Sequence, residues 1–262
     1  MGTAVITGAS SGIGAVYADR LARRGYDLLI VGRNQGRLND LAKRLGNDTA
    51  SEIEALVADL RDPVDLIKVE KVLREDPRVT LLLNNAGVGA VKPLLDSDVA
   101  DMTKMIALNI EAPVRLTYAV VPAFVARSSG TIINISSIVA IAPEILNGVY
   151  GGTKAFVLAF SQSLRHELAA RGIRVQAVLP GATATNFWSR AGKPVEDLPP
   201  ALVMPVDVMV DAALAGLDRG EFITIPSLPD EGQSASLEAA RQALLLDLSH
   251  TEPASRYQMV RR

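Results

Sequence analysis

The chain has no cysteine and only two histidines among its 262 residues. Without cysteine it can form neither disulfides nor thiolate sites, and two isolated histidines, His166 and His250, make a poor metal site. An excess of one charge is also missing, because 27 basic residues nearly balance 29 acidic ones and leave a formal net charge of -2. This balance gives no electrostatic reason to expect binding to nucleic acid or to an anionic membrane. We therefore expect no metal, no nucleic-acid partner and no membrane partner.

Long hydrophobic runs are missing as well, since no apolar stretch reaches the roughly 20 residues that a helix needs to span a bilayer. Residues 3–7 have the character of a buried strand rather than of a secretory signal, and Ile6 stands where a myristoylation motif requires Ser or Thr. We expect a cytoplasmic protein. With 48% hydrophobic and 21% charged residues the composition is globular, and the length suits one large domain.

Short runs rich in β-branched residues alternate with longer amphipathic stretches along most of the chain. This alternation is typical of successive βαβ units, in which helices cover both faces of a parallel sheet. The expected strands lie near residues 3–7, 27–32, 53–58, 79–84, 131–136, 173–179 and 221–226. The sequence therefore predicts an α/β fold that is Rossmann-like and doubly wound, with a mostly parallel seven-stranded sheet flanked by helices on both faces.

A glycine-rich turn follows the first expected strand, with the sequence Thr7-Gly8-Ala9-Ser10-Ser11-Gly12-Ile13-Gly14. Such a turn lets backbone N–H groups approach a pyrophosphate, and the N-terminus of the following helix adds a partial positive charge. The G-x-x-x-G-x-G spacing differs from the general G-x-G-x-x-G dinucleotide fingerprint. The turn predicts phosphate binding, and a plain strand-turn-helix connection is the alternative.

The end of the second expected strand bears on the choice of cofactor. NAD-binding folds of this type carry an acidic residue there, about 20 residues beyond the turn, that accepts hydrogen bonds from ribose hydroxyls. This chain has Arg33 instead, which can pair with a 2′-phosphate. NADP(H) is therefore favoured over NAD(H), with a solvated surface arginine as the alternative. After the third strand, Asp59 could accept from an adenine amino group or cap a helix.

Tyr150 and Lys154 have the spacing that places two side chains on one face of a helix. A free tyrosine has a pKa of about 10, but a nearby cation lowers that value and suits the phenol to proton exchange near neutral pH. Ser137 follows the fifth expected strand, and the apolar stretch 138–147 leads from it toward Tyr150. That stretch suits the wall of a pocket or packing beneath the next helix.

Two further stretches carry amides. Residues 84–87, Asn-Asn-Ala-Gly, follow the fourth expected strand at the carboxyl edge of the sheet, where ligands of such folds bind. Asn84 could instead tie strands together. Asn109 is a lone amide in an apolar helical stretch, 97–126, and should be hydrogen-bonded. Pro113 cannot donate to the Asn109 carbonyl, so we expect a local kink there.

In combination these motifs resemble the short-chain dehydrogenase/reductase (SDR) family in its compact, single-domain branch. The motifs that carry the resemblance, over residues 1 to about 226, are the turn Thr7 to Gly14, Asn84 to Gly87, Asn109, Ser136-Ser137, Tyr150 with Lys154, Pro180-Gly181 and Thr185. The resemblance implies one NAD(P)-binding Rossmann domain over residues 1–262. It also implies an oxidoreductase that moves hydride between a nicotinamide and a CH–OH carbon.

The resemblance also implies roles for individual residues. Tyr150 would give a proton to the carbonyl oxygen in reduction or accept one from the alcohol in oxidation, while Ser137 holds that oxygen. Lys154 would bind the nicotinamide ribose and lower the pKa of Tyr150, and Asn109 would hold a water that links Lys154 to solvent. The cofactor-binding residues it implies are Gly8, Ser10, Gly12, Ile13, Gly14, Arg33, Asp59, Leu60, Asn85, Gly87, Tyr150, Lys154, Pro180, Gly181 and Thr185.

A segment rich in aromatic residues and proline, at about 186–205, is expected to form a loop over the substrate or a packed surface loop. An apolar pocket lined by Ile138, Ile141, Phe187 and Trp188 would favour a hydrophobic ketone or secondary alcohol.

The C-terminal segment departs from the family pattern, because many members close the last strand with an Asp-Gly-Gly turn that is used in tetramer packing. Here the strand runs into Pro226-Ser-Leu-Pro, and an extra helix is expected at about 234–246 within a tail that spans about 227–262. We therefore expect a homo-oligomer that is a homodimer, through the helices near 97–126 and 151–170, rather than a homotetramer.

The leading hypothesis is an NADP(H)-dependent oxidoreductase that acts on a hydrophobic ketone or secondary alcohol. The alternatives are an NAD-dependent alcohol dehydrogenase of the same family and a non-catalytic NADP-binding regulatory protein. A sugar-nucleotide epimerase or dehydratase would share the Tyr and Lys, but the glycine spacing and the compact length argue against it.

Overall fold

The computed structural model describes residues 1–257. By its contacts the chain forms two compact units, Met1–Ser227 and Leu228–Arg262. The first unit holds the whole sheet and every predicted site residue. That residues 1–262 form one domain stays a prediction.

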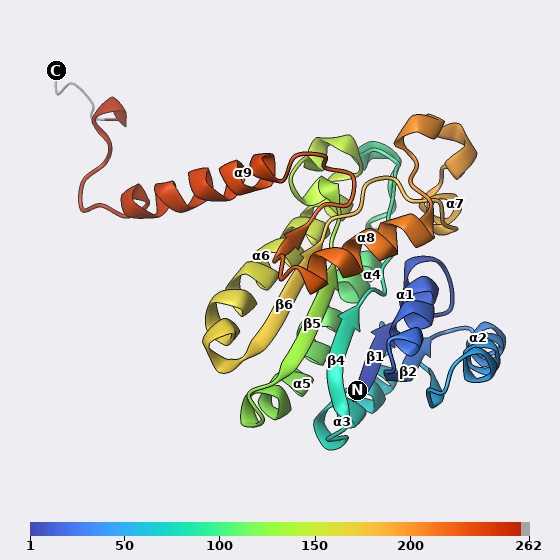
Figure 1. The fold of residues 1–262 in the computed structure, drawn as a ribbon. Coiled ribbons are helices and arrows are strands. Elements are labelled where there is room, and N and C mark those ends of the chain that lie inside the picture. Colours follow the sequence, from blue (N-terminus) through green and yellow to red (C-terminus); the bar gives the residue numbers. More distant parts are fainter. Residues whose placement is uncertain (258–262) are drawn as a thin grey trace. The chain divides into compact units, whose positions relative to one another are not determined.

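The sheet of the first unit confirms the predicted fold class (Figure 1). Its strands are β1 (Thr3–Thr7), β2 (Asp27–Gly32), β3 (Ile53–Val57), β4 (Val79–Asn84), β5 (Gly130–Ile135), β6 (Ile173–Val178) and β7 (Ile223–Thr224). They lie in the order β3-β2-β1-β4-β5-β6-β7, and each neighbouring pair is parallel. The last strand is shorter than the predicted 221–226 and pairs with β6 through only two residues.

Helices cover both faces of this sheet. They are α1 (Gly12–Arg23), α2 (Gln35–Asp48), α3 (Pro63–Glu75), α4 (Val99–Ile106), α5 (Ala112–Ala126), α6 (Gly148–Leu168), α7 (Phe187–Ala191) and α8 (Val206–Asp218). Helices α1, α2 and α8 share one buried cluster with the sheet, and α3, α5 and α6 share the other. Because side chains alternate along a strand, Ile6 belongs to the first cluster and its neighbour Val5 to the second.

The connections of β1 and β4 determine where a ligand can bind. These two strands are neighbours in the sheet, yet the chain leaves β1 toward β2 on one side and leaves β4 toward β5 on the other. The segments that follow their carboxyl ends therefore separate and leave a crevice, which is the usual ligand site of an open α/β sheet. The glycine-rich turn after β1 and residues 85–87 after β4 lie at this point.

The predicted helical stretch 97–126 is confirmed, with an irregularity in its middle. Between α4 and α5 the backbone forms a π-helical turn, Ala107–Glu111, in which the N–H of Ala112 donates to the carbonyl of Ala107. Pro113 lies just inside α5 and has no N–H to give to the Asn109 carbonyl. The expected kink is therefore a π-turn, a feature often found at functional sites.

The second unit carries α9 (Glu231–Ala243), which is followed by the short 3-10 helix Leu244–Asp247. The Asp230 side chain caps α9 by accepting from the N–H of Gly232. The extra helix predicted at about 234–246 is therefore present and begins a few residues earlier. None of the helices within residues 1–257 combines the length and the apolar character needed to cross a bilayer.

Candidate active site

Helix α6 presents Tyr150 in its first turn because a side chain caps its N-terminus. The Asn147 Oδ1 accepts from the N–H groups of Val149 and Tyr150 at 2.9 and 3.3 Å. The Nδ2 of the same residue donates to the Lys92 carbonyl at 2.7 Å. The cap therefore fixes where the helix starts and ties it to the segment that follows β4. Sequence reasoning missed this role of Asn147, although asparagine just before a helix is a recognisable capping signal.

Lys154 lies one turn beyond Tyr150, and its side chain is buried. Its Nζ donates to the carbonyl of Ile135, at the end of β5, at 2.9 Å. Burial lowers the pKa of this ammonium from 10.5 to about 8, because removal from water favours the neutral amine. The residues that line the cavity at this ammonium include no carboxylate that would oppose the shift.

Tyr150 is also buried, with 5% of its surface exposed, and the Lys154 Nζ lies 5.9 Å from the centre of its ring. Burial raises the pKa of the phenol to about 12, and a hydrogen bond with the Ser137 side chain acts against this shift. The lowered pKa that the Tyr-Lys spacing suggested is therefore wrong for this structure. Desolvation disfavours the phenolate, so the phenol holds its proton at neutral pH.

Ser137 follows β5, and its side chain is 9% exposed. Its Oγ is 3.4 Å from both the carbonyl of Pro180 and the N–H of Val139, so both contacts are long. A hydroxyl held this loosely can turn toward a new acceptor without losing a strong bond. The neighbouring Ser136 differs, because its Oγ donates to the carbonyl of Lys154 at 2.7 Å and so links the end of β5 to α6.

Asn109 lies in the π-turn, and its side chain is bonded to the protein on every side. Its Nδ2 donates to the carbonyl of Val88 at 2.9 Å and to the Thr153 Oγ1 at 3.0 Å, and its Oδ1 accepts from the N–H of Val88 at 3.0 Å. The Thr153 Oγ1 in turn donates a hydrogen bond to the backbone carbonyl of Tyr150 at 2.8 Å. Both hydrogens of the Asn109 side-chain amide therefore bind protein acceptors. The water that Asn109 was expected to hold would have to donate to a carbonyl oxygen instead.

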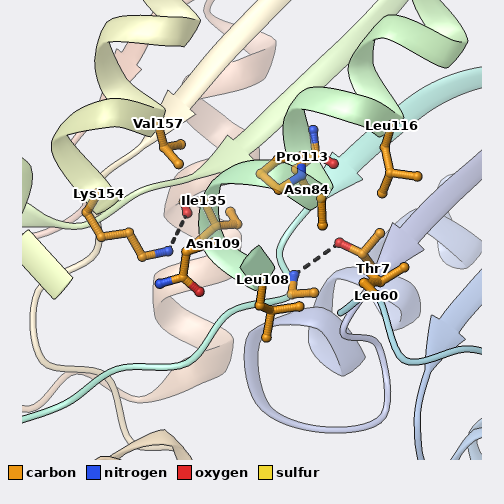
Figure 2. Close-up of a pocket in the computed structure, with 12 residues that line it drawn as sticks. Thr7, Leu60, Asn84, Leu108, Asn109, Pro113, Leu116, Ile135, Lys154 and Val157 are labelled. Carbon is orange, nitrogen blue, oxygen red and sulfur yellow. Dashed lines mark hydrogen bonds between the residues drawn. The ribbon is translucent and has the colours of Figure 1, made fainter. Parts of the chain in front are cut away.

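A small cavity lies behind this group of residues (Figure 2). It measures about 10 Å³, close to the least space that one water molecule needs. Lys154 and Asn109 reach it from α6 and from the π-turn, and Pro113 and Asn84 line it farther along. The Oδ1 of Asn84 is buried without a hydrogen-bond partner, while its Nδ2 donates to the Oδ1 of Asn134 at 2.9 Å. Asn84 thus ties β4 to β5, as the structural interpretation of this residue predicts.

The turn after β1 has the shape that close approach of a ligand to the backbone requires. Gly8 and Gly12 have φ angles of 67° and 57°, which favour glycine. A Cβ added at Gly14 would lie 2.5 Å from the Asn85 Nδ2 and 2.6 Å from the Gly8 carbonyl. Such a tight glycine cradle fits the phosphates of a dinucleotide.

The predicted cofactor residue Asn85 serves this turn directly. Its Nδ2 donates to the carbonyl oxygens of Thr7 and Gly8 at 2.8 and 3.3 Å. The Thr7 Oγ1 in turn accepts from the N–H groups of Asn85 and Ala86 at 2.9 and 3.0 Å. The structure therefore uses the Asn85 amide to hold the glycine turn against the end of β4.

Arg33 follows β2, and its side chain is half exposed at the edge of the crevice. One guanidinium nitrogen is 3.8 Å from the Asp59 carboxylate. Arg61 binds the same carboxylate at 2.6 and 3.0 Å and is the main reason why the pKa of Asp59 is lowered. Asp59 is therefore engaged with arginines, and Leu60 beside it is buried in the core and lines the cavity.

The remaining predicted cofactor residues lie around the same crevice. A Cβ at Gly87 would meet the Asn109 Oδ1 at 3.2 Å and the Lys154 Nζ at 3.6 Å, so that glycine leaves room beside the ammonium. A Cβ at Gly12 would meet the Thr185 Cγ2 at 3.3 Å, which joins the turn after β1 to the segment after β6. The four other predicted cofactor residues have these neighbours: Ser10 lies beside Gly32, Ile13 packs against the core, the Pro180 carbonyl lies near the Ser137 hydroxyl, and Gly181 lies near Ile138.

The expected substrate loop, 186–205, contains α7 and two short 3-10 helices, Val195–Asp197 and Pro200–Leu202. Phe187 and Ile138 pack in a small apolar cluster with Tyr150, as expected for a pocket wall. Trp188 instead turns inward and donates its indole N–H to the carbonyl of Thr183 at 3.0 Å. Ile141 is 42% exposed, so two of the four residues predicted to line the pocket lie beside the tyrosine.

Within residues 1–257, no group of three His, Asp or Glu side chains is placed to hold a metal ion. Around Tyr150 the structure therefore offers a phenol, a hydroxyl, a buried ammonium and an apolar wall, next to a turn that fits phosphate.

Comparison with known proteins identifies relatives over most of the chain. The sequence matches the model of the short chain dehydrogenase family over residues 2–195. It is 41% identical over 189 residues to a probable NADP-dependent dehydrogenase of Haemophilus influenzae, a match that covers 71% of this chain and 73% of that protein. For other curated relatives the match spans from 62% to 88% of the relative's own length.

Two solved structures are similar over the whole length. A short-chain dehydrogenase from Sphingobium yanoikuyae, solved in complex with NADPH, is 49% identical with a TM-score of 0.96, covering 98% of this chain and 100% of that chain. A bulky-bulky ketone specific alcohol dehydrogenase from Comamonas testosteroni is 44% identical with a TM-score of 0.91, covering 99% of each chain.

Proposed function

The chain belongs to the short-chain dehydrogenase family, and from this membership we propose that it is an NADP(H)-dependent reductase of hydrophobic ketones, with Tyr150 as its proton donor. As a family member it is an NAD(P)-dependent oxidoreductase. The choice of NADP(H), the ketone and the role of each residue are the parts that we propose. In the opposite direction the same site would oxidise a secondary alcohol, with Tyr150 as the base.

One observation carries the proposal: Tyr150 is a buried phenol whose pKa is raised by burial, it hydrogen-bonds the Ser137 side chain, and the Lys154 Nζ lies 5.9 Å from the centre of its ring. A carbonyl oxygen that gains negative charge during reduction needs a nearby acid and a hydrogen-bond donor. Tyr150 supplies the proton. Ser137, which hydrogen-bonds the Tyr150 side chain and makes only long contacts of 3.4 Å with the backbone, would donate to the same oxygen.

Loss of the proton leaves a phenolate in an apolar site, where it would be costly without a cation. The Lys154 Nζ, 5.9 Å from the ring centre, supplies that charge while it is protonated. Its bond to the Ile135 carbonyl fixes the ammonium in this place, and Thr153 with Asn109 holds the α6 backbone behind it. We assign these two polar residues a positioning role.

For the cofactor, Gly8, Gly12 and Gly14 would hold the phosphates, Arg33 the 2′-phosphate and Lys154 the nicotinamide ribose. When bound, NADPH supplies the hydride. Arg33 supports the preference for NADP(H) because its cation lies half exposed at the crevice, although the Asp59 carboxylate 3.8 Å away weakens that charge. The NADPH complex of the similar Sphingobium protein agrees with this choice.

The apolar surroundings of Tyr150 support a hydrophobic substrate. Tyr150 forms a buried apolar cluster with Met105 and Val139, and the residues packed against this cluster are Val88, Ala90, Met102, Ile138, Leu146, Val149 and Phe187. A wall of this kind binds an apolar substituent and leaves polar contacts to the carbonyl oxygen. The name of the similar Comamonas protein, a ketone-specific alcohol dehydrogenase, agrees with this class. We also propose a cytoplasmic homodimer.

The test is to titrate the protein with NADPH and with NADH, and then to follow oxidation of the preferred cofactor with a panel of aromatic, aliphatic and steroid ketones. Tyr150→Phe should lower kcat by about 100-fold or more and leave NADPH affinity within about twofold. Tyr118→Phe, at a tyrosine that is 72% exposed, is the matched control and should behave as the wild type.

The outcomes separate the alternatives. Tighter binding of NADH would identify an NAD-dependent alcohol dehydrogenase of the same family. Binding of NADPH without turnover of any ketone or alcohol, unaffected by Tyr150→Phe, would identify a regulatory NADP-binding protein and refute the proposed reaction.

A further inference from the structure

Phe187, the first residue of α7, covers part of Tyr150. Their ring centres are 5.7 Å apart and the ring planes are inclined by 44°. Phe187 also meets Trp188 edge-on, with the ring centres 5.6 Å apart. The ring therefore belongs to the apolar cluster that contains Tyr150.

The tip of the Phe187 ring rests on the backbone of Gly89. A Cβ added at Gly89 would lie 2.8 Å from the Phe187 Cε2 and closer still to Cζ, nearer than a real Cβ approaches a neighbouring atom. Gly89 does not lie in the left-handed region, so alanine fits its backbone and only the ring stands in the way. The absence of a side chain at Gly89 therefore allows the Phe187 ring to occupy its position beside Tyr150.

Hydrogen bonds at both ends of α7 hold the ring there. The Trp188 indole donates to the carbonyl of Thr183 at 3.0 Å, and the N–H of Val91 donates to the carbonyl of Ala191 at 3.2 Å. Helix α7 is thereby attached to the segment that contains Gly89. The ring cannot withdraw unless this attachment loosens or the side chain changes rotamer.

We propose that Phe187, seated on Gly89, determines substrate specificity by limiting the room beside Tyr150 for one of the two substituents of a ketone. The proposal rests on the proposed ketone reduction and adds which residue pair sets the size limit. A ketone whose oxygen reaches Tyr150 and Ser137 must place one substituent against this wall. A small substituent fits beside the ring, and a large one competes with it for space.

The first test compares acetophenone, with one small substituent, and benzophenone, with two large ones. Phe187→Ala should raise the ratio of kcat/KM for benzophenone to that for acetophenone by about tenfold or more, because a missing group in an apolar pocket changes discrimination by that order. Most of the change should appear in KM, and NADPH affinity should stay the same. An unchanged ratio, in a wild type that reduces both ketones, would overturn this proposal and leave the proposed function intact.

A double-mutant cycle tests the link to Gly89. Gly89→Ala should displace the ring and change the same ratio by severalfold, whereas in the Phe187→Ala background it should have no further effect because the obstructing ring is gone. Equal effects in both backgrounds would overturn the role of Gly89. Gly46→Ala is the matched control, because a Cβ there has no atom within 4 Å and should leave the ratio unchanged.

A second readout does not depend on turnover. Trp188 is the only tryptophan in the chain and touches Phe187, so its fluorescence reports movement of that ring. Gly89→Ala should shift the emission in the wild-type background and not in the Phe187→Ala background. Quenching by each ketone also gives a dissociation constant, and the ratio of the two constants should change with Phe187→Ala. If no ketone is reduced but Phe187→Ala changes the ratio of the two dissociation constants, the proposed reaction is refuted and the proposed size limit stands. If no ketone is reduced and that ratio is also unchanged, both proposals are refuted.

Discussion

The buried Lys154 predicts an unusual dependence of stability on pH. The perturbation is Lys154→Met, which keeps much of the apolar stem and removes the titrating amine. In the folded protein the pKa of Lys154 is about 8, below its ordinary 10.5. Between these two values the unfolded chain binds the proton that the folded protein has released, so the wild type gains stability as the pH rises. Below pH 8 both states are protonated, and the full cost of burying the charge remains.

The size of the effect follows from the two pKa values. The gain approaches about 3 kcal/mol over the whole interval, of which about 2 kcal/mol falls between pH 8 and pH 10. Tyr150 acts in the opposite sense at higher pH. Its pKa is raised from 10.0 to about 12 by burial, so its contribution is present below pH 10 and is lost as the pH rises toward 12. Measurements that stop at pH 10 largely avoid it.

The assay is urea denaturation of the wild type and of Lys154→Met at steps from pH 7 to pH 10. The free energy of unfolding of the wild type, minus that of the variant, should rise by about 2 kcal/mol between pH 8 and pH 10. Lys43→Met, at an exposed lysine on α2, is the matched control and should give a difference that changes little over this interval. A flat difference for Lys154→Met would refute the assignment of Lys154 as a desolvated ammonium.

Three further substitutions test other parts of the site. Gly14→Val places atoms within 2.6 Å of the Gly8 carbonyl, so it should abolish NADPH binding in a titration and destabilise the fold by about 1–3 kcal/mol. Arg33→Ala should reduce the preference for NADPH over NADH by about tenfold in the same titration, because it removes the cation proposed for the 2′-phosphate; an unchanged preference would contradict that role. Thr153→Ala leaves one Asn109 amide hydrogen without its acceptor and should cost about 1–3 kcal/mol in urea denaturation. Thr153→Ser should restore most of this loss, and equal losses in both variants would point to the methyl group instead.

Features repeated along the chain could be predicted from the sequence. Three strands, β1, β2 and β4, have the predicted bounds, because each is a short apolar run closed by turn residues. The carboxyl ends of β1 and β4 had to lie near each other once a doubly wound sheet was inferred, and the glycine turn and Asn85 do meet there. The edge strand β7 was predicted too long. Its apolar residue Phe222 packs into the core, whereas only Ile223 and Thr224 pair with β6.

Features that depend on contacts between distant segments could not be predicted. The Tyr150 pKa is set by burial among residues from several elements, which the local spacing to Lys154 does not reveal. The Asn109 side chain hydrogen-bonds Val88 and Thr153, which are 21 and 44 positions away. Nothing in the local sequence marks either residue as its partner. Gly89 stands among other glycines after β4, and only its approach to the Phe187 ring sets it apart.

The same desolvation shifts Tyr150 and Lys154 in opposite directions, and this opposition suits the proposed reduction. An apolar site disfavours charge on either group, so the phenol keeps its proton while the ammonium is close to losing its own. At neutral pH the pair therefore carries one positive charge and one available proton. Transfer of that proton to a substrate would leave a phenolate beside the ammonium, two charges that stabilise each other where neither is stable alone. Because burial makes Tyr150 a poor acid in isolation, we expect the proposed proton transfer to depend on Lys154.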